Sequence, residues 1–234
     1  LLVQGFKLVD GRRDVDFQVF EVLAAEALCR QGRYAAHDRS TLAEVLDSAW
    51  RLAAERFLPY AALTDVQEPA VLDGRVRVVP EARAALDALR AAGFIAAPFP
   101  AEVGGLQVPQ VVTQACNAQF AASQVGFHGY AMLTAGVANV ILAFGSEDQR
   151  RRFVPALLEG RFFGTMCLSE PHAGSSLTDI RTRAEPIADG RYAIRGDKMW
   201  ISGGEHELSE NIVPLVLAKA PGGPPGVKGI SLFI

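Results

Sequence analysis

The sequence predicts an α+β protein in which a helical domain of residues 1–160 precedes a β domain of residues 161–234. Up to Gly160, apolar residues recur with the three- and four-residue spacing of amphipathic helices. After Arg161, β-branched and aromatic residues alternate with polar ones, which is the spacing of half-buried strands. A run of helices followed by a run of strands favours an α+β fold over a parallel α/β sheet.

Helices account for most of the first domain. They are expected at residues 14–32, 40–59, 80–93, 109–125, 131–144 and 146–160. Ser146 and Gln149 form a capping box at the start of the last helix. The fourth and fifth helices are apolar on most faces, which predicts that they are buried between other elements. Residues 64–79 are polar and contain an Asp73-Gly74 turn, so we expect a loop there.

Paired strands are expected in the second domain. They lie at residues 165–168, 181–184, 191–195, 198–204, 211–218 and 227–234. The Asp189-Gly190 pair between the second and third of these strands is a hairpin signal. A turn rich in proline and glycine, residues 221–226, separates the last two strands.

Composition fits a globular protein that buries a core, with 50% hydrophobic and 21% charged residues. The net charge of −3 shows no basic excess, so we expect no nucleic-acid or membrane partner. Three distant cysteines lack metal-ligand or redox spacing, which predicts reduced thiols and a cytoplasmic location. No apolar run is expected to be long enough to span a bilayer. Because the chain starts with Leu1 and stops inside an expected strand, we expect a piece of a longer protein.

The candidate site is the stretch from residue 164 to residue 204. It contains serine hydroxyls, a Gly174-Ser175 turn and Trp200, which paired strands would bring together. A flat, polar aromatic cofactor needs such a set, because it requires a stacking face, hydrogen bonds at its edge and a close backbone approach. The stretch therefore predicts a cofactor site.

Two segments of this stretch resemble signature sequences of the acyl-CoA dehydrogenase family. MCLSEPHAGS at residues 166–175 is similar to the first signature, and KMWISGG at residues 198–204 is similar to the strand that follows it. The similarity covers nearly all of residues 75–234. The spellings SEPHAGSS, GGEHELSENIV and PGGPPGVKGISLFI also resemble the subgroup that includes 3-methylmercaptopropionyl-CoA dehydrogenases.

The resemblance implies a helical N-terminal domain, an antiparallel β-barrel-like middle domain and a C-terminal four-helix domain that is absent from this chain. FAD would lie between the last two domains and would oxidise an acyl-CoA thioester at its α and β carbons. The family's base is usually a glutamate of the C-terminal domain, so no catalytic residue is assigned within this chain. The resemblance also implies an electron-transfer flavoprotein as electron acceptor and a homo-oligomer.

Matched position by position, the resemblance assigns contacts with FAD to Met166, Leu168, Ser169, Gly174, Ser175, Trp200 and Ser202. The first three would meet the pyrimidine side of the flavin through backbone groups and the Ser169 hydroxyl. Many family members have threonine there; serine keeps the hydroxyl but lacks the methyl group that stiffens the rotamer.

The remaining assigned residues would meet other parts of the ligands. Gly174 and Ser175 would approach phosphates of FAD or coenzyme A, and Ser175 would also contact the substrate. Trp200 would pack on the isoalloxazine, and Ser202 would form a hydrogen bond near N5. Ser176 stands where family members often have aspartate, so the internal hydrogen bonds of that turn are expected to differ.

Each residue also has a structural alternative. Ser169 could end a strand and cap a turn, Trp200 could be a core residue, and Gly174-Ser175 alone would be a turn. Their joint occurrence at the family's spacing favours the flavin site. Residues 205–207 (EHE) have no further metal-ligand pattern and are interpreted as a polar loop, so no metal site is assigned.

Other functions stay open at this stage. They are an acyl-CoA oxidase or a flavin monooxygenase of the same fold, and a non-catalytic fragment or binding module. Because one wall of the flavin cleft would be missing, the 234-residue chain made alone is expected to bind FAD weakly and to be inactive.

Overall fold

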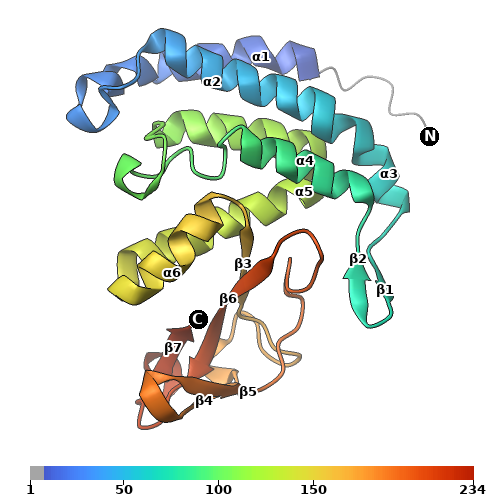
Figure 1. The fold of residues 1–234 in the computed structure, drawn as a ribbon, viewed down its shortest axis with the longest axis vertical. Coiled ribbons are helices and arrows are strands. Elements are labelled where there is room, and N and C mark those ends of the chain that lie inside the picture. Colours follow the sequence, from blue (N-terminus) through green and yellow to red (C-terminus); the bar gives the residue numbers. More distant parts are fainter. Residues whose placement is uncertain (1–7) are drawn as a thin grey trace.

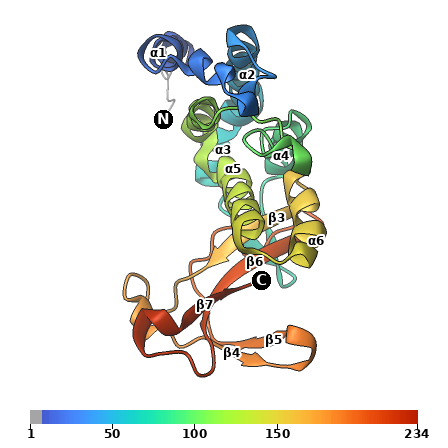
Figure 2. The same ribbon diagram turned by 90° about the vertical axis from the view of Figure 1, so that its left-hand side faces the viewer.

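The computed structural model describes the backbone of residues 8–234 and the side chains of residues 11–234. Residues 1–7, which the predicted helical domain includes, lie outside the described residues. Helices stack in tiers on one side of a larger β-sheet, and α5 lies between the upper helices and the sheet (Figures 1 and 2).

The first helical segment is interrupted. It consists of α1 (Leu8–Asp16), a π-helical turn (Phe17–Val22) and a 3-10 helix (Ala25–Arg30). The break lies at Ala24, whose φ of 45° is left-handed. The continuous helix expected over residues 14–32 is therefore wrong, because it begins earlier and breaks in the middle.

The second helix, α2 (Arg39–Leu52), begins at a capping box. The Asp38 carboxylate accepts a hydrogen bond from the Thr41 N–H, and the Thr41 hydroxyl accepts one from the Asp38 N–H, each at 2.8 Å. The helical path then continues through short π and 3-10 turns (Ala53–Phe57 and Leu58–Tyr60) and α3 (Ala61–Val66). The predicted stop at Pro59 is wrong, because this proline lies in the first turn of a 3-10 segment, where its N–H is not needed.

Residues 64–79 do not form only a loop. They contain a hairpin of β1 (Ala70–Leu72) and β2 (Arg75–Arg77). The predicted Asp73-Gly74 turn connects the two strands, and both of its residues have positive φ, 51° and 74°. The three-residue strands are too short for the alternation of apolar and polar residues to reveal them.

Two helices match their prediction closely. α4 (Pro80–Ala91) starts at its proline, and α6 (Glu147–Leu158) starts at the predicted capping box. In that box the Ser146 Oγ accepts from the Gln149 N–H at 3.2 Å, and the Gln149 Oε1 accepts from the Ser146 N–H at 2.8 Å. Further 3-10 helices lie at Gly32–Tyr34, Ala101–Val103, Leu177–Asp179, Ala188–Gly190 and Gly226–Gly229.

One long helix, α5 (Gln110–Phe144), replaces the two helices expected over residues 109–125 and 131–144. Its backbone leaves the helical region at Gln124, where φ is −163° and ψ is 94°. The Gln124 Oε1 accepts a hydrogen bond from the Phe127 N–H at 3.1 Å, so this side chain caps the second half of the helix. The kink therefore takes the place of the expected interhelical gap.

By length and composition, α5 could cross a membrane, contrary to the expectation that no apolar run is long enough. It packs against α2, α4, α6 and β3, and a single helix of this kind is weak evidence for a membrane span. The predicted burial of this segment between other elements is confirmed at many of its positions.

The larger sheet is mixed and open within residues 8–234. Its strands are β3 (Phe162–Cys167), β4 (Arg183–Pro186), β5 (Tyr192–Arg195), β6 (Asn211–Lys219) and β7 (Ile230–Phe233), in the order β3-β6-β4-β5 with β7 also paired to β6. β3 and β6 are parallel because residues 168–210 form a long crossover between them. The expectation of an antiparallel sheet is therefore wrong for this pair and for the parallel contact of β4 with β6, and it holds for β4–β5 and β6–β7.

The hairpin predicted at Asp189-Gly190 is confirmed, with Arg183 opposite Arg195 and Pro186 opposite Tyr192. The strand expected over residues 198–204 is wrong, because this segment is irregular. Trp200 and Gly203 have φ of 59° and 66°, and left-handed residues interrupt an extended chain.

A buried threonine fixes β3 on α5. The Gly164 N–H of β3 donates to Thr134 Oγ1 at 3.0 Å, and the Thr134 hydroxyl donates to the Tyr130 carbonyl oxygen at 2.7 Å. Thr134 is fully buried. The contact sets the position of the strand that leads into the candidate site.

Substituting Thr134 with valine is expected to lower the free energy of unfolding by about 1–3 kcal/mol, because the buried Gly164 N–H loses its acceptor at nearly constant side-chain volume. Urea unfolding measures the change. The exposed Thr178→Val is the matched control and should change the stability much less. An equal loss of stability in the two variants would show that the buried Thr134 hydroxyl contributes no more to stability than the exposed Thr178 hydroxyl.

Candidate functional site

The candidate site forms where β3 ends. Hydrogen bonds join β3 and the first motif to the second motif: Thr165 Oγ1 to Ser202 O at 2.7 Å, Lys198 Nζ to Leu168 O at 2.9 Å, and Met199 N to Ser169 O at 3.0 Å. Irregular backbone, rather than the expected paired strands, therefore brings the motifs together.

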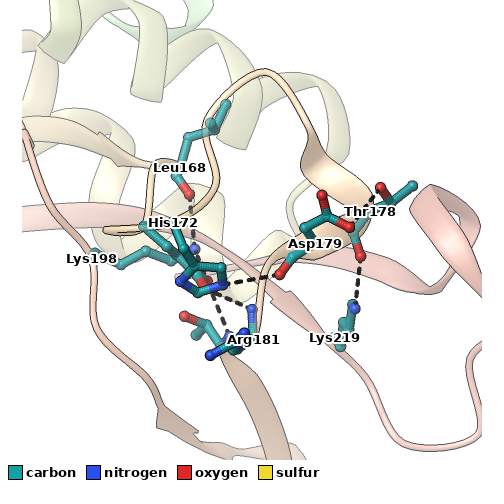
Figure 3. A network of polar contacts seen from close by, with 9 residues as sticks. Leu168, His172, Thr178, Asp179, Arg181, Lys198 and Lys219 are labelled. Atoms are coloured by element: carbon teal, nitrogen blue, oxygen red, sulfur yellow. Dashed lines mark hydrogen bonds and ion pairs between the residues drawn. The ribbon is translucent and has the colours of Figure 1, made fainter.

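A buried carboxylate lies at the centre of these contacts. Glu170 is 2% exposed and accepts hydrogen bonds from the Arg181 N–H at 2.6 Å and the Thr182 N–H at 3.0 Å. The Lys198 ammonium binds it at 3.0 Å and is itself largely buried. Figure 3 shows Lys198 and Leu168 in this network beside His172. Glu170 thus connects the first motif to the second.

Ionisation of Glu170 is set by two opposing effects. Burial alone would raise its pKa, but hydrogen bonds from Thr182, Arg181 and Lys198 outweigh burial and hold the pKa at about 2. The carboxylate is therefore ionised at neutral pH. A base with so low a pKa and with its oxygens already bonded is poorly suited to remove a proton, so Glu170 is a positioning group.

The first motif folds back on itself immediately after Glu170. Glu170 and Ala173 exchange two backbone hydrogen bonds, at 2.7 and 3.1 Å. This turn brings Gly174 beside Ser169, since a Cβ on Gly174 would lie 3.9 Å from Ser169 Oγ. Ser175 follows on the exposed side of the turn.

The structure thus gathers the predicted site residues at the end of β3. Met166, Leu168 and Ser169 are half-buried, and Trp200 and Ser202 are exposed on the neighbouring segment. Trp200 is 74% exposed, so its alternative interpretation as a core residue is wrong.

Polar and aromatic groups remain available for a ligand there. The hydroxyls of Ser169, Ser175 and Ser202 form no hydrogen bond with any other residue in the part of the chain with described side chains. Together with the exposed Trp200 indole, they provide hydrogen-bonding groups and a stacking face in one region.

A cavity of about 480 Å³ adjoins the second motif. Lys198, Gly203 and Gly204 line one side, and Tyr130 of α5 and Val76 of β2 line the others. The β1–β2 hairpin is held there by ion pairs from Arg75 and Arg77 to Glu207, the first at 3.2 Å. The hairpin, which the sequence did not reveal, is therefore a wall of the cavity.

Residues 205–207 are only partly the polar loop that was expected. His206 is 5% exposed and packs against Tyr130 and Phe163, with ring centroids 5.1 and 5.6 Å away. Its Nδ1 accepts a hydrogen bond from the Leu208 N–H at 3.1 Å, and burial lowers its pKa. This segment therefore has a packing role.

Glu170 and Lys198 are the important residues that the sequence did not single out. A carboxylate directly after a strand and a lone lysine in the second motif were visible, but nothing in the sequence shows that they are buried together. Burial depends on the crossover that folds residue 198 back against residue 168.

Comparison with known proteins identifies the family. The family model described as acyl-CoA dehydrogenase, N-terminal domain, matches residues 40–161. The chain belongs to the acyl-CoA dehydrogenase family, which confirms the prediction from the two motifs.

Its relatives include several dehydrogenases. The chain is 40% identical over 190 residues to 3-methylmercaptopropionyl-CoA dehydrogenase of Ruegeria pomeroyi, covering 81% of this chain and 32% of that protein. It is 33% identical over 225 residues to a broad-specificity linear acyl-CoA dehydrogenase of Mycobacterium tuberculosis, covering 94% of this chain and 36% of that protein. The chain therefore spans about a third of the length of these curated relatives.

The fold is also that of solved acyl-CoA dehydrogenases. The structure of an acyl-CoA dehydrogenase complexed with FAD from Bacillus anthracis matches with a TM-score of 0.66 and 23% identity. The match covers 83% of this chain and 30% of that one. A mixed helical and β fold is therefore confirmed, whereas a closed barrel is not present within residues 8–234.

Proposed function

We propose that the whole protein uses FAD to dehydrogenate an acyl-CoA thioester between its α and β carbons, and that this chain supplies the wall that holds the flavin. The main support for this proposal is the site's set of groups that could contact a ligand. The hydroxyls of Ser169, Ser175 and Ser202 form no hydrogen bond with another described residue, and the indole of Trp200 is exposed. The family membership and the dehydrogenase names of the relatives support the same reaction.

The residues present fit a flavin. Trp200 offers a face for the isoalloxazine, and Ser202 and Ser169 offer hydrogen bonds to its N5 region and pyrimidine edge. The backbone of Met166 and Leu168 adds contacts at that edge. Gly174 and Ser175 would approach the phosphates of FAD or of the substrate, and Ser175 would also contact the substrate. Bound FAD would accept the hydride that leaves the β carbon.

Several parts of the reaction are proposed to come from outside this chain. A C-terminal helical domain would supply the base that removes the α proton and the second wall of the flavin cleft. Residues 1–160 and 161–234 would form the N-terminal and middle domains, and further strands would complete the middle domain as a barrel. The cytoplasmic, homo-oligomeric enzyme would pass its electrons to an electron-transfer flavoprotein.

The whole protein is expected to be yellow when purified and to bleach under anaerobic conditions when a matching acyl-CoA is added. Visible absorption over a panel of acyl-CoA thioesters, including 3-methylmercaptopropionyl-CoA, measures this. Absence of bleaching with every thioester would reject the proposed reaction. Peroxide formation during turnover would assign an oxidase instead. The 234-residue chain alone should show weak FAD binding and no turnover.

Replacing Trp200 with alanine is expected to weaken FAD binding by about tenfold, because stacking of an aromatic ring on an indole contributes about 1–3 kcal/mol. Equilibrium dialysis of the whole apoprotein with FAD measures the affinity. The chain contains two tryptophans, so Trp50→Phe is the matched control and should leave the affinity unchanged. Unchanged FAD affinity in Trp200→Ala would remove this residue from the site.

A further inference from the structure

Three cations lie side by side across the larger sheet. Strand register places Arg183 of β4 opposite Arg195 of β5 on one side and opposite Lys219 of β6 on the other. Residues that are directly opposite each other project to the same face, and like charges in such positions destabilise a sheet. Repulsion among these three cations therefore destabilises the folded sheet unless an anion neutralises their charge.

Protein carboxylates offset only part of this charge. Arg195 forms an ion pair with Glu185 at 3.3 Å. Neither Arg183 nor Arg181 forms an ion pair with a carboxylate among the residues with described side chains. Buried and exposed side chains alternate along this segment. Because Thr182 and Ala184 are buried, Arg181 and Arg183 both project to the exposed face.

These side chains line a cavity of about 560 Å³. Its wall consists of His172, Thr178, Asp179, Arg181, Arg183 and Lys219, together with Ile180. Asp179 is the one carboxylate that lines it, against the charges of two arginines and a lysine. The cavity is therefore net positive and mostly polar.

The wall is held in place by contacts to backbone oxygens. Lys219 Nζ donates to the Thr178 carbonyl at 2.9 Å, and His172 Nε2 lies 3.1 Å from the Asp179 carbonyl oxygen (Figure 3). Arg181 is anchored from behind, because its backbone N–H donates to the buried Glu170. The arginine side chains thus project from a backbone that is already fixed.

We propose that this basic cavity binds a phosphate group that carries the negative charge of a phosphomonoester or of pyrophosphate. Guanidinium groups bind phosphate oxygens in a bidentate manner, and two of them on one fixed stretch of backbone, at Arg181 and at Arg183 of β4, suit a group with several anionic oxygens. The phosphorylated nucleotide end of coenzyme A and free inorganic pyrophosphate carry the same chemistry. The inference goes beyond the proposed function, since binding requires neither flavin nor turnover.

The test is calorimetric titration of the whole protein with inorganic pyrophosphate. The double variant Arg181→Gln/Arg183→Gln is expected to bind about tenfold or more weakly, because charge-assisted bidentate contacts are lost. Arg191→Gln removes a single positive charge just before β5, outside the cavity, and should leave binding unchanged. Affinity of the unaltered protein should also fall as salt is raised.

Further arms of the experiment separate the sources of phosphate. If coenzyme A loses affinity in the double variant and pantetheine does not, the site takes the nucleotide end of coenzyme A. If pyrophosphate alone depends on the arginines, the site takes a free anion. The proposal is overturned if pyrophosphate does not bind, or if it binds equally well to the double variant. Circular dichroism checks that the double variant is folded, and Arg183→Glu provides a second variant that should abolish binding.

Discussion

Replacing Gly164 with valine is expected to lower the free energy of unfolding by about 3 kcal/mol or more, because overpacking at a rigid contact forces backbone movement. A Cβ at this position would lie 2.6 Å from both Cβ and Cγ2 of Val137 and 3.2 Å from the Thr134 Cα. These atoms belong to the central helix, so the clash cannot be relieved by turning the end of a flexible side chain. Thermal and urea unfolding measure the loss.

Gly129→Ala is the matched control for this substitution. It lies on α5 as well, and a Cβ there would meet nothing within 4 Å. Alanine is a better helix former than glycine, so this variant should be at least as stable as the unaltered protein. If Gly164→Val unfolds at the same urea concentration as Gly129→Ala, β3 is not held against α5 as closely as the structure indicates.

The contact matters for function because β3 leads directly into the candidate site. Moving Gly164 away from Val137 would also move Thr165, whose hydroxyl holds the Ser202 carbonyl at 2.7 Å. Loss of FAD binding is therefore expected to accompany loss of stability in Gly164→Val. A strand packed without an intervening side chain is thus part of how this chain positions its site.

Elements with strong local signals could be predicted from the sequence. α6 begins at a capping box, and the β4–β5 hairpin turns at Asp189-Gly190, because these signals are satisfied by neighbouring residues alone. Features that depend on distant contacts could not. The kink of α5 at Gln124, the continuation past Pro59 and the parallel pairing of β3 with β6 follow from tertiary structure.

The same division applies to the site. Motif spacing was enough to select residues that the structure brings together, such as Ser169 and Gly174. It gave the wrong local conformation for residues 198–204, because the alternation around Trp200 resembles a strand while its left-handed backbone interrupts one. It also missed Glu170, since the burial that gives this carboxylate its role arises from residues 181, 182 and 198 together.

Replacing Glu170 with glutamine is expected to lower the free energy of unfolding by about 3 kcal/mol, because it leaves a buried ammonium without its partner. Lys198 would lose its ion pair, and the amide NH2 that replaces one carboxylate oxygen would face the N–H donor of either Arg181 or Thr182. FAD binding should weaken in parallel, since both motifs are joined at this carboxylate. Glu185→Gln, in an exposed ion pair with Arg195, is the control and should cost less than about 1 kcal/mol.

The pH dependence of this difference identifies its cause. Hydrogen bonds hold the pKa of folded Glu170 at about 2, below its ordinary value of 4.5, despite the opposing effect of burial. A lowered folded pKa contributes stability that is fully present above pH 4.5 and is lost as the pH falls towards 2. The stability gap between the unaltered protein and Glu170→Gln should therefore be constant near neutral pH and should narrow in acid, as urea unfolding at several pH values will measure. A gap that stays constant down to pH 2 would mean that the substitution acts through packing rather than through the loss of a charge.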